Sequence, residues 1–165
     1  MRLAYAAVAA AVVAADQLTK LAIVRTLPEG ASVPLVEGLV DIVHVRNPGA
    51  AFGLFRGATA FLVLAAAVGV GVFTLILLRR PPVVTGIAAG LVAGGALGNL
   101  LDRVFRPWPF RGTVVDFIDI GWWPAFNVAD IAVTVGAGLL ILTGMREGRE
   151  DTGGDETAED RGPGE

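Results

Sequence analysis

The sequence predicts an all-α membrane protein with four transmembrane helices and a small β-like cradle between spans one and two. The chain is 54% hydrophobic and has a mean hydropathy of +0.65, so it is too apolar for an ordinary soluble domain. Four of its stretches are apolar and long enough to cross a bilayer as helices. Between the first two, a short segment alternates with the period of two that is typical of a half-buried strand.

Four transmembrane spans are expected at residues 3–24, 58–78, 83–101 and 125–145. The third is rich in glycine and alanine, which let helices approach closely in lipid. The first is interrupted by polar residues from Asp16 onward, which leaves open a cleavable signal peptide that ends at the small residues before Asp16. The apolar pattern resumes at Leu21, and a cleaved leader has no need of that, so we favour a retained span.

The residues after the fourth span, 146–165, have a different composition. They contain eight acids and three arginines, and they lack apolar residues to bury. Such a segment is expected to be disordered. The chain therefore divides into a membrane domain, residues 1–145, and an acidic tail to which we assign no function.

Composition excludes several catalytic classes. Cysteine is absent, so thiol nucleophiles, disulfides and thiolate metal sites are excluded. The single serine, Ser32, and the single histidine, His44, lie in a Val- and Pro-rich stretch without a nucleophile elbow, which argues against a serine hydrolase. One histidine without cysteine also disfavours a zinc site. If the protein is a hydrolase, carboxylates must carry the reaction.

The cradle prediction rests on residues 39–46, LVDIVHVR, in which odd and even positions would face opposite sides of a strand. NPGAAFGLF follows, from Asn47 to Phe55, with glycines that permit turns and with apolar Phe and Leu residues. The segment fits a surface that rests on the membrane, and a simple glycine-containing loop fits the pattern equally well. His44 is expected to be a strand-face residue and not a ligand.

Asp16 and Lys20 interrupt the first span four residues apart, so they share a helix face and can pair. An ion pair at the helix end, with Lys20 reaching to the membrane surface, is one explanation. A role in a functional site is the other, and the pattern favours neither.

Two further groups of polar residues lie at the end of the third span and at the start of the fourth. Asn99, Asp102 and Arg103 exceed what a helix-end patch needs. Asn127 and Asp130 share a helix face; capping explains Asn127 well and Asp130 less well, because Asp130 lies a turn further in. In any alternating topology, both groups lie on the same membrane side as the end of span one. We therefore expect a single polar pocket at one interface.

The segment 114–119, VVDFID, supplies a further carboxylate. If it is extended, Asp116 and Asp119 face opposite sides, so only one of them can enter the pocket. Asp119 lies close to a tryptophan pair suited to the interface and is expected to be solvated. Asp116 and Asp130 then remain as two carboxylates that share a proton. Such a pair can activate a water molecule for attack on a carbonyl and return the proton to a leaving amine.

Five sequence blocks resemble those of the lipoprotein signal peptidases, the type II signal peptidases of bacteria. The resemblance covers Leu3 to about Met145. It implies a four-helix aspartic protease of the inner membrane, with both termini cytoplasmic and with residues 25–57 and 102–124 extracytoplasmic. The blocks, in the family's order, are DQLTK (Asp16 to Lys20), NPGAAFGLF (Asn47 to Phe55), GALGNLLDRV (Gly95 to Val104), VVDFID (Val114 to Asp119) and FNVAD (Phe126 to Asp130).

The resemblance also implies an activity and a set of site residues. Enzymes of this family cut prolipoproteins on the amino side of a cysteine that already carries diacylglycerol, without a metal or cofactor. The implied partners are prolipoprotein substrates and the lipid bilayer, with no nucleic acid, and the chain is expected to be a monomer. The catalytic pair maps onto Asp116 and Asp130. The implied substrate-binding or pocket-supporting residues are Asp16, Lys20, Asn47, Gly49, Asn99, Asp102, Arg103 and Asn127.

Two other classes remain open from the sequence: a small proton-coupled transporter and a non-catalytic membrane assembly factor. The acids cluster at one interface instead of forming a path across the membrane, and no inverted repeat is evident, which argues against a transporter. An assembly factor would tolerate the exchange of either acid for asparagine. The GxGD motif of the presenilin and prepilin peptidase families is absent.

Overall fold

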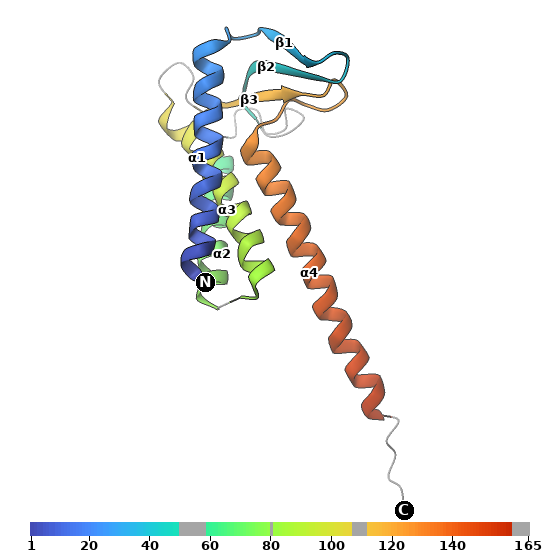
Figure 1. Cartoon of the computed structure of the whole chain (residues 1–165). Helices are drawn as coiled ribbons and strands as arrows, with labels where there is room; N and C mark the ends of the chain where they lie inside the picture. Colours follow the sequence, from blue (N-terminus) through green and yellow to red (C-terminus); the bar gives the residue numbers. More distant parts are fainter. Residues whose placement is uncertain (50–58, 80, 107–111, 160–165) are drawn as a thin grey trace, which may run out of the picture.

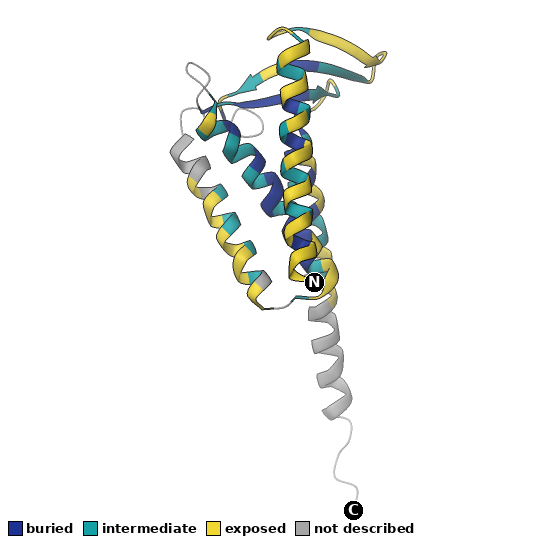
Figure 2. Ribbon diagram, turned by 60° about the vertical axis from the view of Figure 1, so that its left-hand side comes forward, coloured by how far each residue is buried: buried dark blue, intermediate teal, exposed yellow. Residues whose placement is uncertain are grey.

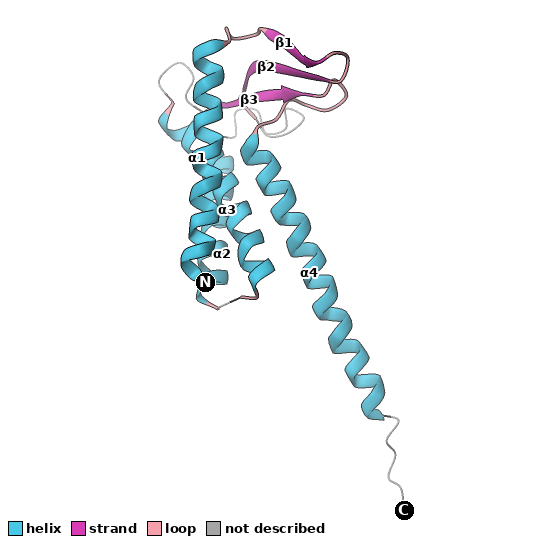
Figure 3. Ribbon diagram, in the orientation of Figure 1, coloured by secondary structure: helices cyan, strands magenta, loops and turns pink. Residues whose placement is uncertain are grey.

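The computed structural model describes residues 1–49, 59–79, 81–106 and 112–159 of the 165-residue chain. A small sheet lies at one end of a bundle of helices, and the N-terminus lies at the opposite end (Figure 1, Figure 3). In chain order the elements are α1 (Arg2–Thr26), β1 (Ser32–Val36), β2 (Val40–Asn47), α2 (Thr59–Leu78), α3 (Val83–Phe105), β3 (Val114–Asp119) and α4 (Val128–Glu159). The sheet end therefore collects the end of α1, the end of α3 and the start of α4.

Within the described residues, three helices are long and apolar enough to cross a membrane: α1, α3 and the Val128–Arg146 part of α4. In α2, only a shorter apolar stretch is found, Ala66–Ile76, which is not long enough to be counted with these three. Large apolar side chains such as Leu75 and Ile141 are exposed, and Figure 2 shows the outer surfaces of α1 and α2 largely in the colour of exposed residues. Apolar outer surfaces are what lipid-facing helices require. The fold is a mostly helical membrane protein, and the number of four spans stays a prediction.

The helix boundaries differ from the expected ones at two places. The limits of α1 and α2 agree with the expectation to within two residues, but α3 continues to Phe105, four residues beyond its expected end. It can do so because Asp102, in this extension, is buried and paired inside the protein. α4 begins at Val128, three residues later than expected, since Asn127 caps it.

The acidic tail also differs from the expectation. A disordered segment was expected over residues 146–165, but α4 continues without interruption to Glu159, and residues 160–165 lie outside the described part. Figure 1 shows this part of α4 projecting beyond the other helices. Glu and Arg have high helix propensity. A segment that extends an existing helix also avoids the cost of nucleation. The segment is therefore helical because it continues an existing helix, although it has no apolar residues to bury.

The cradle is a three-stranded antiparallel sheet in the order β1-β2-β3. Two of its strands come from the segment between α1 and α2; β2 was predicted from the sequence, whereas β1 was not. The third comes from the segment between α3 and α4, so the cradle joins two connections that are distant in the chain. Residues 50–55, also assigned to the cradle from the sequence, lie outside the described residues.

The strict alternation expected for β2 is broken in its middle. The pairing with β3 shifts register between Ile42 and Val45, and the neighbours Val43 and His44 are both buried. His44 turns inward because its Nδ1 makes a hydrogen bond of 2.8 Å with Leu27 O, in the connection after α1. A register shift of this kind directs two successive side chains away from solvent.

Glycines on α3 let this helix pack closely against its neighbours. A Cβ on Gly90 would lie 2.8 Å from Tyr5 O in α1. A Cβ on Gly95 would collide with the carbonyl oxygen of Ala129 in α4. Small residues at such positions are the usual means by which helices approach each other in lipid. The backbones of α1 and α4 therefore pack directly against α3, on two of its sides.

Gly94→Ala is expected to lower the thermal stability of the protein. The added Cβ would lie 2.7 Å from Ala9 O and 2.8 Å from Val12 Cβ, so α1 must move away from α3. Forcing a methyl group into a packed interior costs about 1–3 kcal/mol. Gly138→Ala is the matched control, because nothing lies within 4 Å of a Cβ there. It should be neutral, or stabilising by about 0.5–1 kcal/mol through helix propensity. Thermal unfolding in detergent compares the two, and a wild-type Tm for Gly94→Ala would contradict the close packing.

Candidate active site

Asp116 lies in the middle of β3, and only 3% of it is exposed. Its Oδ2 accepts a hydrogen bond from Asn47 Nδ2 (3.0 Å), and its Oδ1 accepts one from Asn127 Nδ2 (2.6 Å). Asn47 reaches it because β2 and β3 are neighbours in the sheet. Asp119 accepts the Gly121 N–H in an exposed setting instead. The two strand aspartates therefore have different surroundings, as opposite faces of a strand require.

Asp130 lies in the first turn of α4, where the helix dipole favours a carboxylate. Its Oδ2 accepts the Asn127 N–H (3.2 Å), while its own N–H donates to Asn127 Oδ1 (3.0 Å). This reciprocal pair is a capping box, so the sequence-based view that capping suits Asp130 poorly is wrong. Asp130 Oδ1 faces α3 and accepts a hydrogen bond from Asn99 Nδ2 (2.9 Å). Asn127, which is fully buried, thus connects the carboxylate of β3 with that of α4.

Arg103 brings a positive charge from α3 to the same place. Its guanidinium donates to Gly49 O (2.9 Å) and to Asn99 O (3.2 Å). Gly49 donates its own N–H to Asn47 Oδ1 (2.9 Å), so the residues that follow β2 are held against α3. Arg103 Nε is buried and has no hydrogen-bond partner in the described part of the chain. One N–H of the guanidinium therefore has no acceptor among the described residues.

These side chains border one hollow, the site hollow, of about 300 Å³ between the sheet and the helices. A second hollow of about 370 Å³ runs along α4 and shares Asp130 and Trp123 with the first, and its walls include Trp122 and Ile131. A polar floor therefore continues into an apolar groove. The residues around the site hollow are Asn47, Gly49, Asn99, Arg103, Val114, Asp116, Trp123, Pro124, Ala125, Phe126, Asp130, Val133 and Thr134.

Lys20 lies behind the site hollow and is 0% exposed. Its Nζ lies 2.8 Å from Asp16 Oδ2 and 3.1 Å from Asp102 Oδ2, and it donates to Asn99 Oδ1 (2.9 Å). The explanation in which Lys20 reaches to the membrane surface is therefore wrong. The lysine points inward because two carboxylates from two helices meet it there, which compensates the cost of removing its charge from water.

The two carboxylates that bind Lys20 also hold the backbone around the site. Asp16 Oδ1 accepts the N–H of Ala129, in the first turn of α4 (3.0 Å). Asp102 Oδ2 accepts the N–H of Val115, next to Asp116 in β3 (3.1 Å). The ion cluster of Asp16, Lys20 and Asp102 thus ties α1 and α3 to both elements that carry the pair Asp116 and Asp130.

Two members of this network were not singled out from the sequence. Gln17 Nε2 donates to Asp16 Oδ2 (3.1 Å) and to Asp102 Oδ1 (3.3 Å). Arg106 forms an ion pair of 2.7 Å with Asp102, four residues earlier in α3. The spacing of Asp102 and Arg106 is a signal that was present in the sequence. Gln17 is a polar residue within an apolar span and belongs to the block DQLTK, but nothing local predicts that its amide lies between two helices.

The pKa of Asp116 is raised from 3.8 to about 6. Burial is the largest cause, because the charged form loses its hydration. The nearby Asp130 raises the pKa further, while the hydrogen bonds from Asn47 and Asn127 lower it. A carboxyl with such a pKa can hold or release a proton near neutral pH, which is what acid–base catalysis requires.

Asp116→Asn is expected to change how thermal stability depends on pH. Between pH 3.8 and about 6 the folded wild type holds a proton that the unfolded chain releases. Wild-type stability therefore falls as the pH rises through this window, by roughly 3 kcal/mol in total. The variant lacks this titration, so its Tm in detergent should fall less between about pH 4 and pH 7 than that of the wild type. Parallel Tm curves for the two proteins would contradict the raised pKa.

A sequence model of the family described as Signal peptidase (SPase) II matches residues 8–146. The chain belongs to this family. The Lipoprotein signal peptidase of Mycobacterium avium is 47% identical over 137 residues, which cover 82% of this chain and 75% of that protein. The Lipoprotein signal peptidase of Syntrophotalea carbinolica is 46% identical over 151 residues, which cover 86% of this chain and 90% of that protein. The family resemblance read from the five sequence blocks is confirmed.

The fold of this signal peptidase II family member is similar to solved structures of bacterial membrane enzymes obtained by the in meso method. One, at 2.3 Å resolution, has a TM-score of 0.80 and 31% identity, with 87% of this chain and 88% of that chain covered. Another, at 1.9 Å, has a TM-score of 0.75 and 32% identity, with 85% and 91% covered. Signal peptidase II membership makes the chain a membrane-associated protease that removes signal peptides from prolipoproteins.

Proposed function

We propose that the chain is an aspartic endopeptidase in which Asp116 and Asp130 share one proton and activate a water molecule. The observation that carries this proposal is that both carboxylates border the site hollow and hydrogen-bond to the same residue, Asn127. Close carboxylates do not both ionise readily, so one keeps a proton. The ionised acid takes a proton from water as the water attacks the scissile carbonyl. That proton then passes to the leaving amine.

The neighbouring polar residues have separate roles in this proposal. Asn47 and Asn99 each donate to one of the two aspartates and fix their orientation. Arg103 has an unused Nε–H and binds a backbone carbonyl of the substrate. Gly49, whose carbonyl Arg103 holds, and Asn127 complete the wall and the floor. The ion cluster supports this arrangement from behind without meeting the substrate.

The proposed substrate is a prolipoprotein whose cysteine carries diacylglycerol, and the proposed cut is on the amino side of that cysteine. A lipid-bearing residue needs a polar site for its backbone and an apolar path for its acyl chains. The site hollow offers the first. The groove walled by Trp122 and Ile131 offers the second, and the two share Asp130. The acyl chains can therefore stay in lipid while the peptide bond meets the acids.

We also propose four spans in the bacterial cytoplasmic membrane, with both termini in the cytoplasm and the site near the extracytoplasmic face. Trp122, which is 78% exposed, and Trp123 lie at the sheet end, and such aromatic residues favour the membrane interface. Arg2 and Arg79 lie at the opposite end of the bundle, and cytoplasmic ends of spans are enriched in arginine. The tryptophan pair supports a site close to one membrane interface, and Arg79 at the turn between α2 and α3 supports cytoplasmic termini.

Cleavage of a synthetic diacylglyceryl prolipopeptide by the purified full-length protein in nanodiscs tests this function. Mass spectrometry should find a product that begins with the lipidated cysteine. The same peptide with an unmodified cysteine should be cut at least about tenfold more slowly, since it lacks the acyl contacts. Equal cutting of both peptides, or a cut at another bond, would contradict the proposed substrate. Proton flux into vesicles without peptide cleavage would favour a transporter instead.

A further inference from the structure

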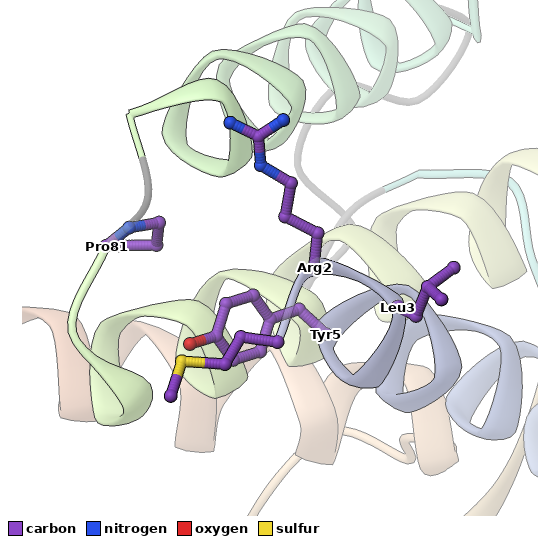
Figure 4. A pocket seen from close by; sticks show the side chains of 5 residues that line it. Arg2, Leu3, Tyr5 and Pro81 are labelled. Atoms are coloured by element: carbon purple, nitrogen blue, oxygen red, sulfur yellow. The ribbon is translucent and has the colours of Figure 1, made fainter.

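A third hollow, of about 400 Å³, lies at the end of the bundle opposite the sheet. It is formed by the first turns of α1 and by the connection between α2 and α3 (Figure 4). It shares no residue with the site hollow, and in the proposed orientation it lies at the cytoplasmic end of the bundle. Its lining residues are Met1, Arg2, Leu3, Tyr5 and Pro81.

Tyr5 forms the buried wall of this hollow. It is 2% exposed, and its ring packs so closely on α3 that a Cβ at Gly86 would collide with it. Figure 4 shows the phenol extending away from α1, with its hydroxyl at the far end of the ring. The hydroxyl oxygen is buried and has no hydrogen-bond partner among the described residues. Buried hydroxyls without a partner are rare in proteins, so this one indicates a ligand that accepts its hydrogen.

The charged side chain in the lining of the hollow is positive, Arg2. Arg2 donates to Leu78 O at the end of α2 (3.0 Å) and is exposed, as is Arg79 beyond it. The sequence has no Asp or Glu before Asp16 and none over residues 59–101, so α1, α2 and α3 carry no acid near this hollow. The N-termini of α1 and α3 also lack side-chain caps, and their N–H groups add partial positive charge. The ligand is therefore an anion.

The rim of the hollow and the helix ends next to it expose apolar side chains. Leu3 is 87% exposed, and Leu78 and Val83 are exposed as well. Such a rim suits acyl chains, whereas a free inorganic anion gains nothing from it. We infer that this hollow binds the headgroup of an anionic phospholipid, with the phosphate between the Arg2 guanidinium and the Tyr5 hydroxyl. Each of the two groups would donate a hydrogen bond to the phosphate, and the charged guanidinium of Arg2 would make the stronger bond.

The inference predicts selective retention of anionic lipid by the full-length protein. Native mass spectrometry of protein released from nanodiscs of equal parts phosphatidylglycerol and phosphatidylcholine should show preferential retention of phosphatidylglycerol. Arg2→Gln should reduce this preference about fivefold, the value of one arginine near an anionic lipid surface. Arg25→Gln, at the other end of α1, is the matched control and should leave the preference unchanged. Equal preferences in the wild type and Arg2→Gln would overturn the proposal.

Tyr5→Phe removes a single oxygen and keeps the packing on α3, so it tests the site even if Arg2→Gln folds poorly. Wild-type Tm should rise on transfer from phosphatidylcholine nanodiscs to phosphatidylglycerol nanodiscs, and the rise should be smaller in Tyr5→Phe. An equal rise in both proteins would remove Tyr5 from the site and overturn the assignment. Inorganic phosphate added to phosphatidylcholine nanodiscs should have no effect. A phosphate-induced rise equal to that of phosphatidylglycerol would identify a free-anion site and exclude the phospholipid.

Discussion

Asp116→Asn and Asp130→Asn are each expected to lower kcat/KM for prolipopeptide cleavage by about 10³-fold or more. Asparagine has nearly the shape of aspartate, but it can neither accept a proton from water nor return one to the leaving amine. General acid–base catalysis alone contributes about 10²–10⁴-fold, and in a pair that acts as a unit the loss of either member removes the whole function. Single-turnover cleavage in nanodiscs, followed by mass spectrometry, measures the loss.

Asp119→Asn is the matched control for this pair. Asp119 lies in the same strand as Asp116, but it accepts an exposed backbone N–H and does not border the site hollow. Its exchange should leave kcat/KM within about twofold of wild type, as surface substitutions usually do. Thermal unfolding of all three variants separates loss of chemistry from loss of fold. Turnover by Asp116→Asn or Asp130→Asn within tenfold of wild type would remove the proposed pair and favour a non-catalytic role.

The membrane environment explains why much of this fold could be predicted from the sequence. Runs of apolar residues give the helices directly, because only helices satisfy their own backbone in lipid. Against such runs, isolated polar residues stand out. Asn99 and Asp130 were singled out in this way, and the structure brings their side chains within 2.9 Å of each other. Strand periodicity separated Asp116 from Asp119 for a similarly local reason.

The errors concern properties that depend on contacts between distant segments. The sequence could not decide whether Lys20 reaches outward or inward, because the answer depends on Asp102, which lies on another helix. The continuation of α3 beyond Leu101 has the same cause. The double role of Asp130, in the capping box and beside Asn99, depends on how α4 docks against α3. The register shift in β2 depends on a hydrogen bond between His44 and Leu27.

Lys20→Met is expected to cause the largest loss of stability of any single exchange in the ion cluster. The substitution keeps an unbranched apolar chain but leaves Asp16 without its cation, while Asp102 keeps Arg106 at 2.7 Å. Removing one partner of a buried ion pair costs about 3–5 kcal/mol. Thermal unfolding in detergent should show the loss. Arg25→Gln, at the exposed end of the same helix, should change stability by no more than about 0.5 kcal/mol. A small effect of Lys20→Met would mean that the cluster does not hold the helices together.

Asp16→Asn in the Lys20→Met background separates the charge of Lys20 from its position. Asparagine keeps the Oδ1 that accepts the Ala129 N–H (3.0 Å), and the double variant has no uncompensated charge, so it should be more stable than Lys20→Met alone. Activity should not recover with stability. Lys20 Nζ donates to Asn99 Oδ1 (2.9 Å) and thereby turns the amide so that its Nδ2 donates to Asp130. In the proposed mechanism, Lys20 is thus a positioning residue for the acid on α4. If cleavage returns together with Tm, the lysine serves only to balance charge.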